Sequence, residues 1–376
     1  MHASARWRIE PDGLLPEARD IRRLSLEQWG DHKITTVIGR HASIRVALAR
    51  VARIAAADGP TILTGETGTG KELFARALYL LGPRRGKPFI SVNCAQYRDS
   101  QLMASELFGH KRGSFTGAAG DHRGVFESAH GGIVFLDEIA ELSAGAQAML
   151  LRVLSESEIV PVGETMARSV DVRVVAATSR DLPAMVAAGQ FRSDLYFRLR
   201  HLSVHIPAVR ERGEDWELIA GDELQRLVSV TGVRKALAAD AIVVMGDYDW
   251  PGNVRELKSV VHSGFHLADG DLIEAALFAR ELEYESRAAQ LLRVPMSDVT
   301  RDPLARMLED KESFWEAVHR PYLRRALSRA DARAIVEQGL LQSRGSYRRL
   351  LTLFNVADGD YVKFMDFLRH QRLKPD

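Results

Sequence analysis

The sequence predicts an α/β fold with a parallel sheet, followed by helical domains. Within residues 34–208, continuous apolar runs alternate with helical patterns, as in a parallel sheet covered on both faces. These runs are Thr61–Thr64, Phe89–Val92, Ile133–Leu136, Val172–Ala176 and Leu202–Ile206. No further apolar run of this kind follows Ile206, and residues 209–280 show helical patterns only. We expect an all-helical second subdomain over 209–280, a linker over 281–310 and a separate helical domain over 311–376.

Length and composition describe a soluble globular protein of two or three domains. The chain has 376 residues, of which 46% are hydrophobic and 27% charged, with a net charge of +1. The single cysteine, Cys94, excludes an intramolecular disulfide, fits a reducing compartment and reads as a small buried hydrophobe. Without an apolar run of about 20 residues or a secretory signal, we expect a cytoplasmic protein with no membrane partner. Residues 1–33 read as an N-terminal arm or linker.

A glycine-rich loop carries the first chemical signal. Gly65–Lys71 fits G-x-x-x-x-G-K and directly follows the apolar run Thr61–Thr64. A strand that ends in such a loop and opens a helix turns several backbone N–H groups toward one point, and the lysine reaches the outer phosphates. The loop therefore predicts a nucleoside triphosphate site. The residues expected to bind it are Gly65, Glu66, Thr67, Gly68, Thr69, Gly70, Lys71 and Glu72.

A second apolar run ends in two carboxylates, Asp137 and Glu138. In a parallel sheet this ending delivers both groups to the edge where the glycine-rich loop also lies. Asp137 would hold Mg²⁺, and Glu138 would polarise the attacking water. ATP and Mg²⁺ are thus the expected cofactors. A buried strand followed by a solvated acidic turn is the alternative, which the glycine-rich loop disfavours.

Phosphoryl transfer also needs cations that meet the charge developing on the γ-phosphate. Arg192 and Arg198, in Phe191–Leu199, and Arg255, in Trp250–Leu257, are candidates. Spacing alone leaves open that they are surface arginines paired with nearby carboxylates. A second metal site is not expected: two histidines, His201 and His205, flank an apolar run without a third ligand nearby.

Several of these segments, taken in order, resemble a known family. The segments are Gly65–Glu72, Glu106–His110, Gly113–Ala118, Phe135–Glu138, Phe191–Leu199 and Trp250–Leu257. Together they resemble the AAA+ domain of bacterial enhancer-binding proteins, the activators of sigma-54 RNA polymerase. The resemblance covers about residues 34–280. The loop Gly113–Ala118 is its most specific part, because most other AAA+ ATPases lack it.

The resemblance implies a hexameric ring with ATP bound between neighbouring subunits, and it implies roles for further residues. Asn93 would be the switch that holds the catalytic glutamate until the nucleotide state changes. Thr178 would be a sensor at the end of its strand. Arg198, together with Arg192, would reach the neighbour's site as an arginine finger. Arg255 would report nucleotide state from the helical lid.

The resemblance also implies a contact loop for the sigma factor. It comprises Gly113, Ser114, Phe115, Thr116, Gly117 and Ala118. Glycines at both ends allow the loop to rise and fold back, while Phe115 offers an apolar anchor and Thr116 a small polar contact.

Three positions depart from common patterns. Glu72 follows the loop lysine where most such loops have Ser or Thr, so magnesium coordination would depend on Asp137 and water. Ser114 stands where the family usually has Ala, and Ser179 where Asn is common, which weakens the sensor assignment at Thr178.

The C-terminal segment, residues 311–376, has thirteen Lys/Arg against eight Asp/Glu. It loosely resembles the family's helix-turn-helix DNA-binding module, with Tyr347–Phe354 as the first helix and Asp360–Leu373 as the recognition helix. The expected DNA contacts are Arg348, Arg349, Tyr361, Lys363, Phe364 and Arg369, with Arg344 and Arg372 touching phosphate. A basic helical bundle used for oligomer contacts is the alternative.

These observations predict an ATP-driven transcription activator. Its partners would be the sigma-54 RNA polymerase holoenzyme, whose closed promoter complex it would open, upstream promoter DNA and other copies of itself. Residues 1–33 hold no receiver-like domain, so control could come from a separate regulatory protein. Two alternatives are an AAA+ remodelling ATPase with another target and a DNA-binding repressor switched by nucleotide.

Overall fold

The structure is a computed structural model, and it forms two compact units, Met1–Tyr284 and Glu285–Asp376. Each unit is described by itself. The residues that the structure describes are 13–97, 100–115, 118, 120–278, 303–323, 329–343, 346–370 and 373. No helix within these ranges combines the length and apolar character that crossing a membrane requires.

The first unit contains one parallel sheet in the strand order β2-β3-β6-β1-β7. Its strands are β1 Thr61–Thr64, β2 Phe89–Asn93, β3 Ile133–Asp137, β6 Arg173–Thr178 and β7 Leu202–His205. The register pairs Asn93 with Asp137 and Thr64 with Thr178, so the carboxyl ends of four strands lie at one edge. The predicted α/β fold with a parallel sheet is confirmed.

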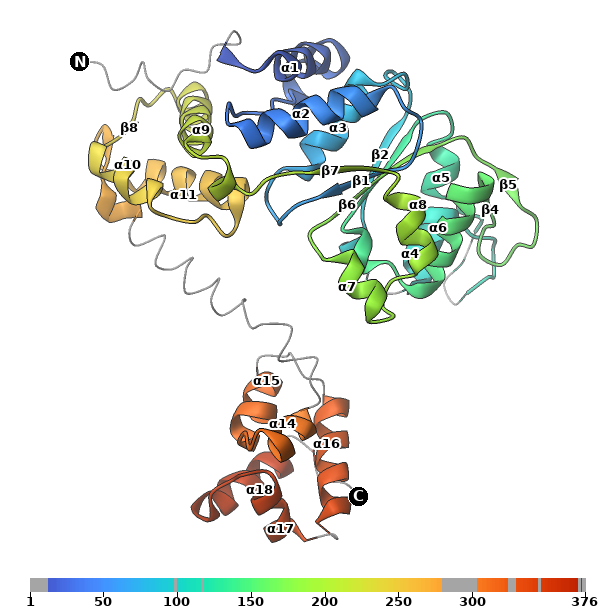
Figure 1. Cartoon of the computed structure of the whole chain (residues 1–376), viewed down its shortest axis with the longest axis vertical. Helices are drawn as coiled ribbons and strands as arrows, with labels where there is room; N and C mark the ends of the chain where they lie inside the picture. Colours follow the sequence, from blue (N-terminus) through green and yellow to red (C-terminus); the bar gives the residue numbers. More distant parts are fainter. Residues whose placement is uncertain are drawn as a thin grey trace. The chain divides into compact units, whose positions relative to one another are not determined.

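Helices cover both faces of this sheet (Figure 1). Alternation along β3 shows why: Val134 and Leu136 belong to the core beneath α4–α8, whereas Ile133 and Phe135 belong to the core beneath α1–α3. The helices are α1 Pro16–Trp29, α2 Ala42–Ala55, α3 Lys71–Leu81, α4 Ser100–Phe108, α5 Val125–Ser128, α6 Ala144–Glu156, α7 Leu182–Ala187 and α8 Ser193–Leu199. Buried apolar side chains on both faces explain the continuous apolar runs of the strands.

Helix α1 corrects one expectation. Ala18 and Ile21 are fully buried in the core that α1 shares with α2 and α3. Trp29 stacks on Tyr79 of α3 with ring centroids 5.7 Å apart. The segment containing α1 is therefore packed onto the α/β layer rather than being an arm or linker.

The lid subdomain follows β7 and has its own core around the fully buried Trp250. It contains the 3-10 turn η5 Val209–Glu211, α9 Asp215–Thr231, α10 Ala239–Gly246 and α11 Asn253–Leu267. A short parallel pair, β8 Ala236–Leu237 and β9 Leu272–Ile273, also belongs to it. The expected helical subdomain thus also contains two short strands, which join the segment between α9 and α10 to the segment after α11.

The second unit is helical. Its elements are α14 Pro303–Glu309, the π-helix Trp315–His319, α15 Arg320–Leu323, α16 Arg329–Gln342, α17 Tyr347–Leu353, a 3-10 turn Asp358–Asp360 and α18 Tyr361–His370. Phe314, Phe354 and Phe364 meet in its core, with Phe314 and Phe364 rings 4.8 Å apart. The helix-turn-helix assignment of α17 and α18 stays a prediction.

Candidate functional site

The glycine-rich loop joins β1 to α3 and wraps around the Lys71 side chain. Lys71 is 7% exposed, and its Nζ donates to the carbonyl oxygens of Gly65 at 3.0 Å and Glu66 at 3.2 Å. Gly68 has φ +81°, and a Cβ there would lie 2.1 Å from the carbonyl oxygen of Gly252. Only glycine fits at this position. The loop thus encloses a buried ammonium group at the N-terminus of α3, where a phosphate can bind.

The two predicted carboxylates lie at the same sheet edge. Lys71 Nζ is 3.7 Å from Glu138 Oε1, and the Glu138 N–H donates to Asp137 Oδ1 at 3.1 Å. Burial raises the pKa of Asp137, the neighbouring Glu138 raises it further, and Lys71 opposes both. The structure therefore brings the loop lysine and both carboxylates together.

Glu138 is held by Ser179, which follows β6. The Ser179 N–H donates to Glu138 Oε2 at 3.2 Å, and Ser179 Oγ donates at 3.1 Å to the same carboxylate. Asn93, predicted to hold the glutamate, instead accepts from the Ala95 N–H at 3.0 Å. Thr178, the predicted sensor, is fully buried and accepts from the Arg180 N–H at 3.0 Å. Neither predicted residue has a hydrogen bond to Glu138 in this conformation.

The lid rests directly on the glycine-rich loop. Asn253 is fully buried, and its Nδ2 donates to Glu66 Oε2 and to the Thr67 carbonyl oxygen, both at 3.1 Å. Arg210 forms an ion pair with the Glu66 carboxylate through both terminal nitrogens. The Arg255 N–H donates to the Gly68 carbonyl oxygen at 3.3 Å. Three lid residues therefore bond directly to the loop.

Arg212 is a further buried residue that bonds to the glycine-rich loop. Its guanidinium is 3% exposed and donates to the carbonyl oxygens of Thr69, at 3.0 Å, and Pro207. Burial lowers the pKa of Arg212 to about 10. Thr69 also bonds within the loop, to the Glu66 carbonyl oxygen at 2.8 Å.

Glu72, which follows the loop lysine, bonds to a nearby side chain. The two predicted arginine-finger residues, Arg192 and Arg198, also have hydrogen-bond partners within the first unit. Glu72 accepts from Arg76 at 2.7 Å, one helical turn away. Arg192 pairs with Asp194 at 2.8 Å, and Arg198 donates to the Leu154 carbonyl oxygen at 2.9 Å. Arg192 and Arg198 thus bond to their own α/β layer, at the side of the unit that carries α8.

The predicted sigma-contact loop rises from a tight backbone ladder. His110 and His122 exchange both backbone hydrogen bonds, at 3.0 and 2.9 Å. Lys111 pairs with Asp121 at 2.7 Å. The Phe115 ring lies edge-on to His110, with centroids 4.9 Å apart. The described segments on both sides of the loop are therefore paired with each other.

Within the loop, the Gly113 N–H donates to the Ala118 carbonyl oxygen at 2.9 Å. Thr116 and Gly117 lie outside the described residues. Ala118 is 6% exposed, which corrects its assignment as a sigma-factor contact in this conformation. Ser114 packs against Gly163, where a Cβ would lie 2.4 Å from Ser114 Cβ, and its hydroxyl is buried without a hydrogen-bond partner among the described residues.

Part of the predicted DNA surface forms a basic hollow in the second unit. A cavity of about 500 Å³ is lined by Arg348, Arg349 and Tyr361, with Leu351 and Thr352. Lys363 lies over the Trp315 ring at 4.5 Å, and Arg369 lies 3.6 Å from Asp366.

Phe364 does not belong to this surface. It is fully buried in the core of the second unit, so its assignment as a DNA contact is corrected. Arg344 and Arg372 lie outside the described residues.

The donor set at the sheet edge fits magnesium better than other metals. The described part of the chain has no group of three His, Cys, Asp or Glu side chains placed to hold a metal ion. Magnesium typically binds one or two carboxylates together with substrate phosphates and water. Asp137, beside the glycine-rich loop, supplies such a carboxylate.

Two functional residues had no assignment from sequence, Asn253 and Arg210. Asn253 lies within Trp250–Leu257, and its φ of +55° marks a constrained backbone. Arg210 follows the last strand of the sheet without any motif of its own. Ser179 was noted only as a departure from the usual asparagine.

The fold and the loop define a P-loop ATPase module of the AAA+ class, with a helical lid. Family models bear this out: "Sigma-54 interaction domain" matches residues 37–205, and "AAA+ ATPase lid domain" matches residues 210–293. Residues 37–205 therefore carry a sigma-54 interaction domain and residues 210–293 an AAA+ lid, and the predicted resemblance is confirmed for this module.

Relatives agree with this assignment. The chain is 45% identical over 259 residues to the Nif-specific regulatory protein of Herbaspirillum seropedicae, covering 69% of this chain and 48% of that one. It is 40% identical over 281 residues to the transcriptional regulatory protein GlrR of Escherichia coli, covering 74% and 63%. The chain spans about half the length of such curated relatives.

Solved structures show the same architecture. The crystal structure of NtrX from Brucella abortus in complex with ATP superposes with a TM-score of 0.61 at 26% identity, covering 90% of this chain and 70% of that one. The complex of NtrX with ADP gives the same TM-score at 27% identity.

Proposed function

We propose that this chain is an ATP-driven activator of sigma-54 RNA polymerase, which converts the closed promoter complex to the open complex. The observation that carries the proposal is the match of residues 37–205 to the sigma-54 interaction domain, which encloses both the P-loop and the loop at Gly113–Ala118. Relatives named as transcriptional regulators support it.

The nucleotide site supports ATP hydrolysis. Lys71 is buried beside the loop and would hold the outer phosphates, as NtrX, a structural relative, was crystallised with ATP. Asp137 would hold Mg²⁺, which supplies charge neutralisation at the phosphates. Glu138 would polarise the attacking water, because its carboxylate lies 3.7 Å from Lys71 Nζ at the same edge.

Nucleotide occupancy would reach the lid through Glu66. The backbone N–H groups of the loop bind phosphate, while the Glu66 side chain points to Arg210 and Asn253. A loop that tightens around phosphate would therefore pull on the lid. Arg255, whose backbone already bonds to Gly68, lies on the same junction.

Assembly as a hexameric ring would complete the site. Arg198 lies on α8 and Arg192 is the residue before it, and both would reach the neighbouring copy's nucleotide as arginine fingers. Asn93 and Thr178 end the two strands that flank β3, at the same edge as Glu138, and would respond to the nucleotide from there. The tip around Phe115 and Thr116 would contact the sigma factor.

The second unit would bind upstream promoter DNA. Arg348, Arg349 and Tyr361 line one hollow, where guanidinium groups can bind phosphate and a phenol can contact sugar or base. Lys363 and Arg369 lie on the following helix, α18. A separate regulatory protein stays part of the proposal as a source of control.

Open-complex formation on a sigma-54 promoter tests the proposed function. With ATP, purified protein and sigma-54 holoenzyme should produce open complexes, and a non-hydrolysable analogue should not. ATP turnover without opening would favour an AAA+ remodeller of another target. DNA binding without turnover would favour a repressor switched by nucleotide.

A further inference from the structure

Helix α8 carries an aromatic side chain that its own unit leaves in solvent. Phe197 is 63% exposed, and it is the only Phe, Tyr or Trp in the exposed class among the described residues of the first unit. Aromatic side chains and arginines are the residue types enriched at protein–protein interfaces.

Three arginines lie close to Phe197 in the sequence. Arg192 and Arg198 lie on the same short helix segment, and the Arg200 guanidinium lies 5.6 Å from the Tyr196 ring beside it. Asp194 is the one carboxylate of this segment and is already paired with Arg192. The α8 surface is thus an aromatic projection with a positive border.

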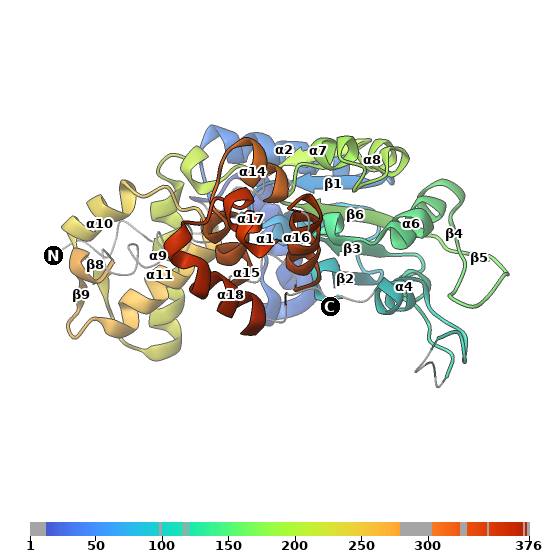
Figure 2. The same cartoon turned by 90° about the horizontal axis from the view of Figure 1, so that it is seen from below.

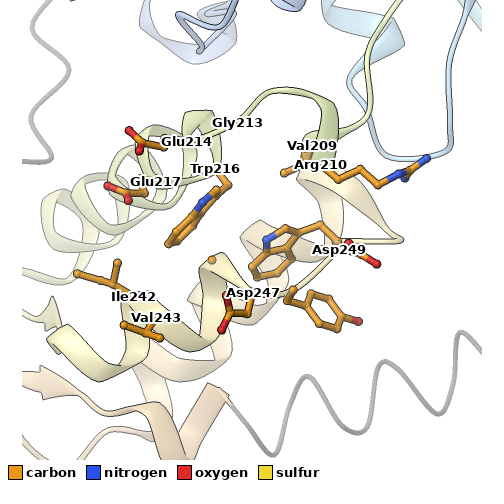
Figure 3. A pocket seen from close by; sticks show the side chains of 13 residues that line it. Val209, Arg210, Gly213, Glu214, Trp216, Glu217, Ile242, Val243, Asp247 and Asp249 are labelled. Carbon is orange, nitrogen blue, oxygen red and sulfur yellow. The ribbon is translucent and has the colours of Figure 1, made fainter.

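The lid carries a groove of the opposite character. A cavity of about 530 Å³ lies between the start of α9, the end of α10 and the turn that follows (Figure 3). Its aromatic walls are Trp216, Tyr248 and Trp250, and Val243 at its rim is 63% exposed. Four carboxylates also line it: Glu214, Glu217, Asp247 and Asp249.

Arg210 is the one Lys or Arg among the residues that line this groove. Arg210 is ion-paired with Glu66 of the P-loop, so the groove as a whole is acidic. An aromatic side chain bordered by arginines complements it in apolar character and in charge.

The projection and the groove lie on opposite sides of the first unit in both views (Figures 1 and 2). They cannot meet within one copy of that unit. Two different complementary surfaces on one subunit produce a head-to-tail contact between copies, which closes into a ring when the rotation between neighbours permits.

We propose that Phe197 of one copy docks in the lid groove of the next copy. The inference rests on the proposed ring ATPase and adds the second contact by which neighbours recognise each other. Docking would bring the α8 arginines of the incoming copy toward the nucleotide side of its neighbour. Because Arg210 joins the groove to Glu66, the same contact would stiffen the P-loop of the receiving copy.

Site-specific crosslinking tests this contact. The only cysteine, Cys94, is buried, and burial raises its pKa to about 12, so it does not compete for a thiol reagent at pH 7.5. Phe197→Cys protein is mixed with Val243→Cys protein, a non-hydrolysable ATP analogue and a short bismaleimide. Val230→Cys is the matched control, since Val230 is an equally accessible lid valine, 75% exposed, that does not line the groove.

The proposal predicts a crosslinked dimer in the Phe197→Cys and Val243→Cys mixture, at least tenfold more abundant than with Val230→Cys. Equal yields or no product would overturn it. Protection of Val243→Cys from maleimide in the monomer would also overturn it, because another segment of the same chain would then occupy the groove.

A charge exchange gives a second readout. Arg200→Glu and Asp247→Arg should each reduce assembly in sedimentation about tenfold, and mixing the two variants should restore it. ATP turnover and ring assembly of wild-type protein are measured in parallel. Wild-type assembly and turnover without preferential crosslinking would refute the docking alone, whereas loss of both in wild-type protein would refute the proposed ring ATPase.

Discussion

Ser179 holds Glu138 with two hydrogen-bond donors, its backbone N–H at 3.2 Å and its hydroxyl at 3.1 Å. The register of the sheet explains the pairing. β3 and β6 are neighbours, and Glu138 and Ser179 follow their carboxyl ends. Glu138 has φ +50°, a conformation that non-glycine residues rarely adopt, so its backbone is constrained where the two hydrogen bonds hold its carboxylate.

Replacing Ser179 with Ala should lower kcat for ATP hydrolysis about tenfold while KM stays within twofold. The variant keeps the backbone donor but loses the hydroxyl, so the carboxylate is less well oriented while the phosphate site is intact. Steady-state turnover measures both constants. Ser179→Thr, which keeps a hydroxyl, should recover most of kcat. A tenfold rise in KM with unchanged kcat would contradict this account.

Lys71→Ala should weaken ATP binding at least 100-fold, or about 2.7 kcal/mol. The ammonium group is the buried cation of the loop, whereas Arg210 and Arg212 bond to the Glu66 side chain and the Thr69 carbonyl oxygen from outside it. Titration with a fluorescent ATP analogue measures the affinity. Lys87→Ala, at an exposed lysine, is the control and should bind normally. Affinity retained in Lys71→Ala would contradict the site assignment.

The sheet, the P-loop and the carboxylate pair could be predicted because each depends on local sequence. Apolar runs specify buried parallel strands, and a loop between β1 and α3 follows from glycine spacing. The partner of Glu138 could not be predicted in the same way, since it depends on which neighbouring strand the side chain approaches. Asn93 and Ser179 flank it from β2 and β6, and only the folded geometry distinguishes them.

In the C-terminal unit, the sequence predicted where helices lie but not which of their faces is buried. Periodicity located α17 and α18, but the face of α18 that turns inward depends on packing with other helices. Phe364 faces Phe314 in the core, whereas Tyr361 stays at the surface. The same reasoning explains α1, whose buried face became apparent only through contact with α3.

Asp137→Asn should raise the melting temperature of the nucleotide-free protein at pH 7.5 by about 2 °C. The pKa of Asp137 is raised by burial, so its ionised form is less favourable in the folded than in the unfolded chain. The penalty is present above the folded pKa and disappears as pH falls below the unfolded value of about 3.9.

Thermal unfolding of both proteins between pH 4 and pH 7.5 checks this sign. The difference should shrink toward low pH. With Mg²⁺ and ATP present, wild-type protein should be the more stable, because asparagine cannot provide the anionic ligand. A lower melting temperature for Asp137→Asn without nucleotide would contradict the assigned cause.

Binding of the chain to duplex DNA should weaken steeply with added salt, because phosphate contacts release counterions. Replacing both Arg348 and Arg349 with Ala should weaken binding at all sequences and reduce the slope of log K against log salt by about 2. Fluorescence anisotropy measures it. The matched control is Arg333→Ala, an arginine of α16 paired with Glu337. An unchanged slope would favour the basic bundle as an oligomer contact.

The measurement that tests the central claim most directly is open-complex formation by sigma-54 RNA polymerase with ATP, using wild-type protein and the tip variants Phe115→Ala and Thr116→Ala. Phe115 packs on the stem at His110, away from Lys71 and Glu138 in sequence and in its contacts, so its loss should spare ATP turnover. The account predicts ATP-dependent opening by wild-type protein and turnover without opening by both variants. Opening that persists in both variants, or wild-type turnover that never opens the promoter, would contradict it.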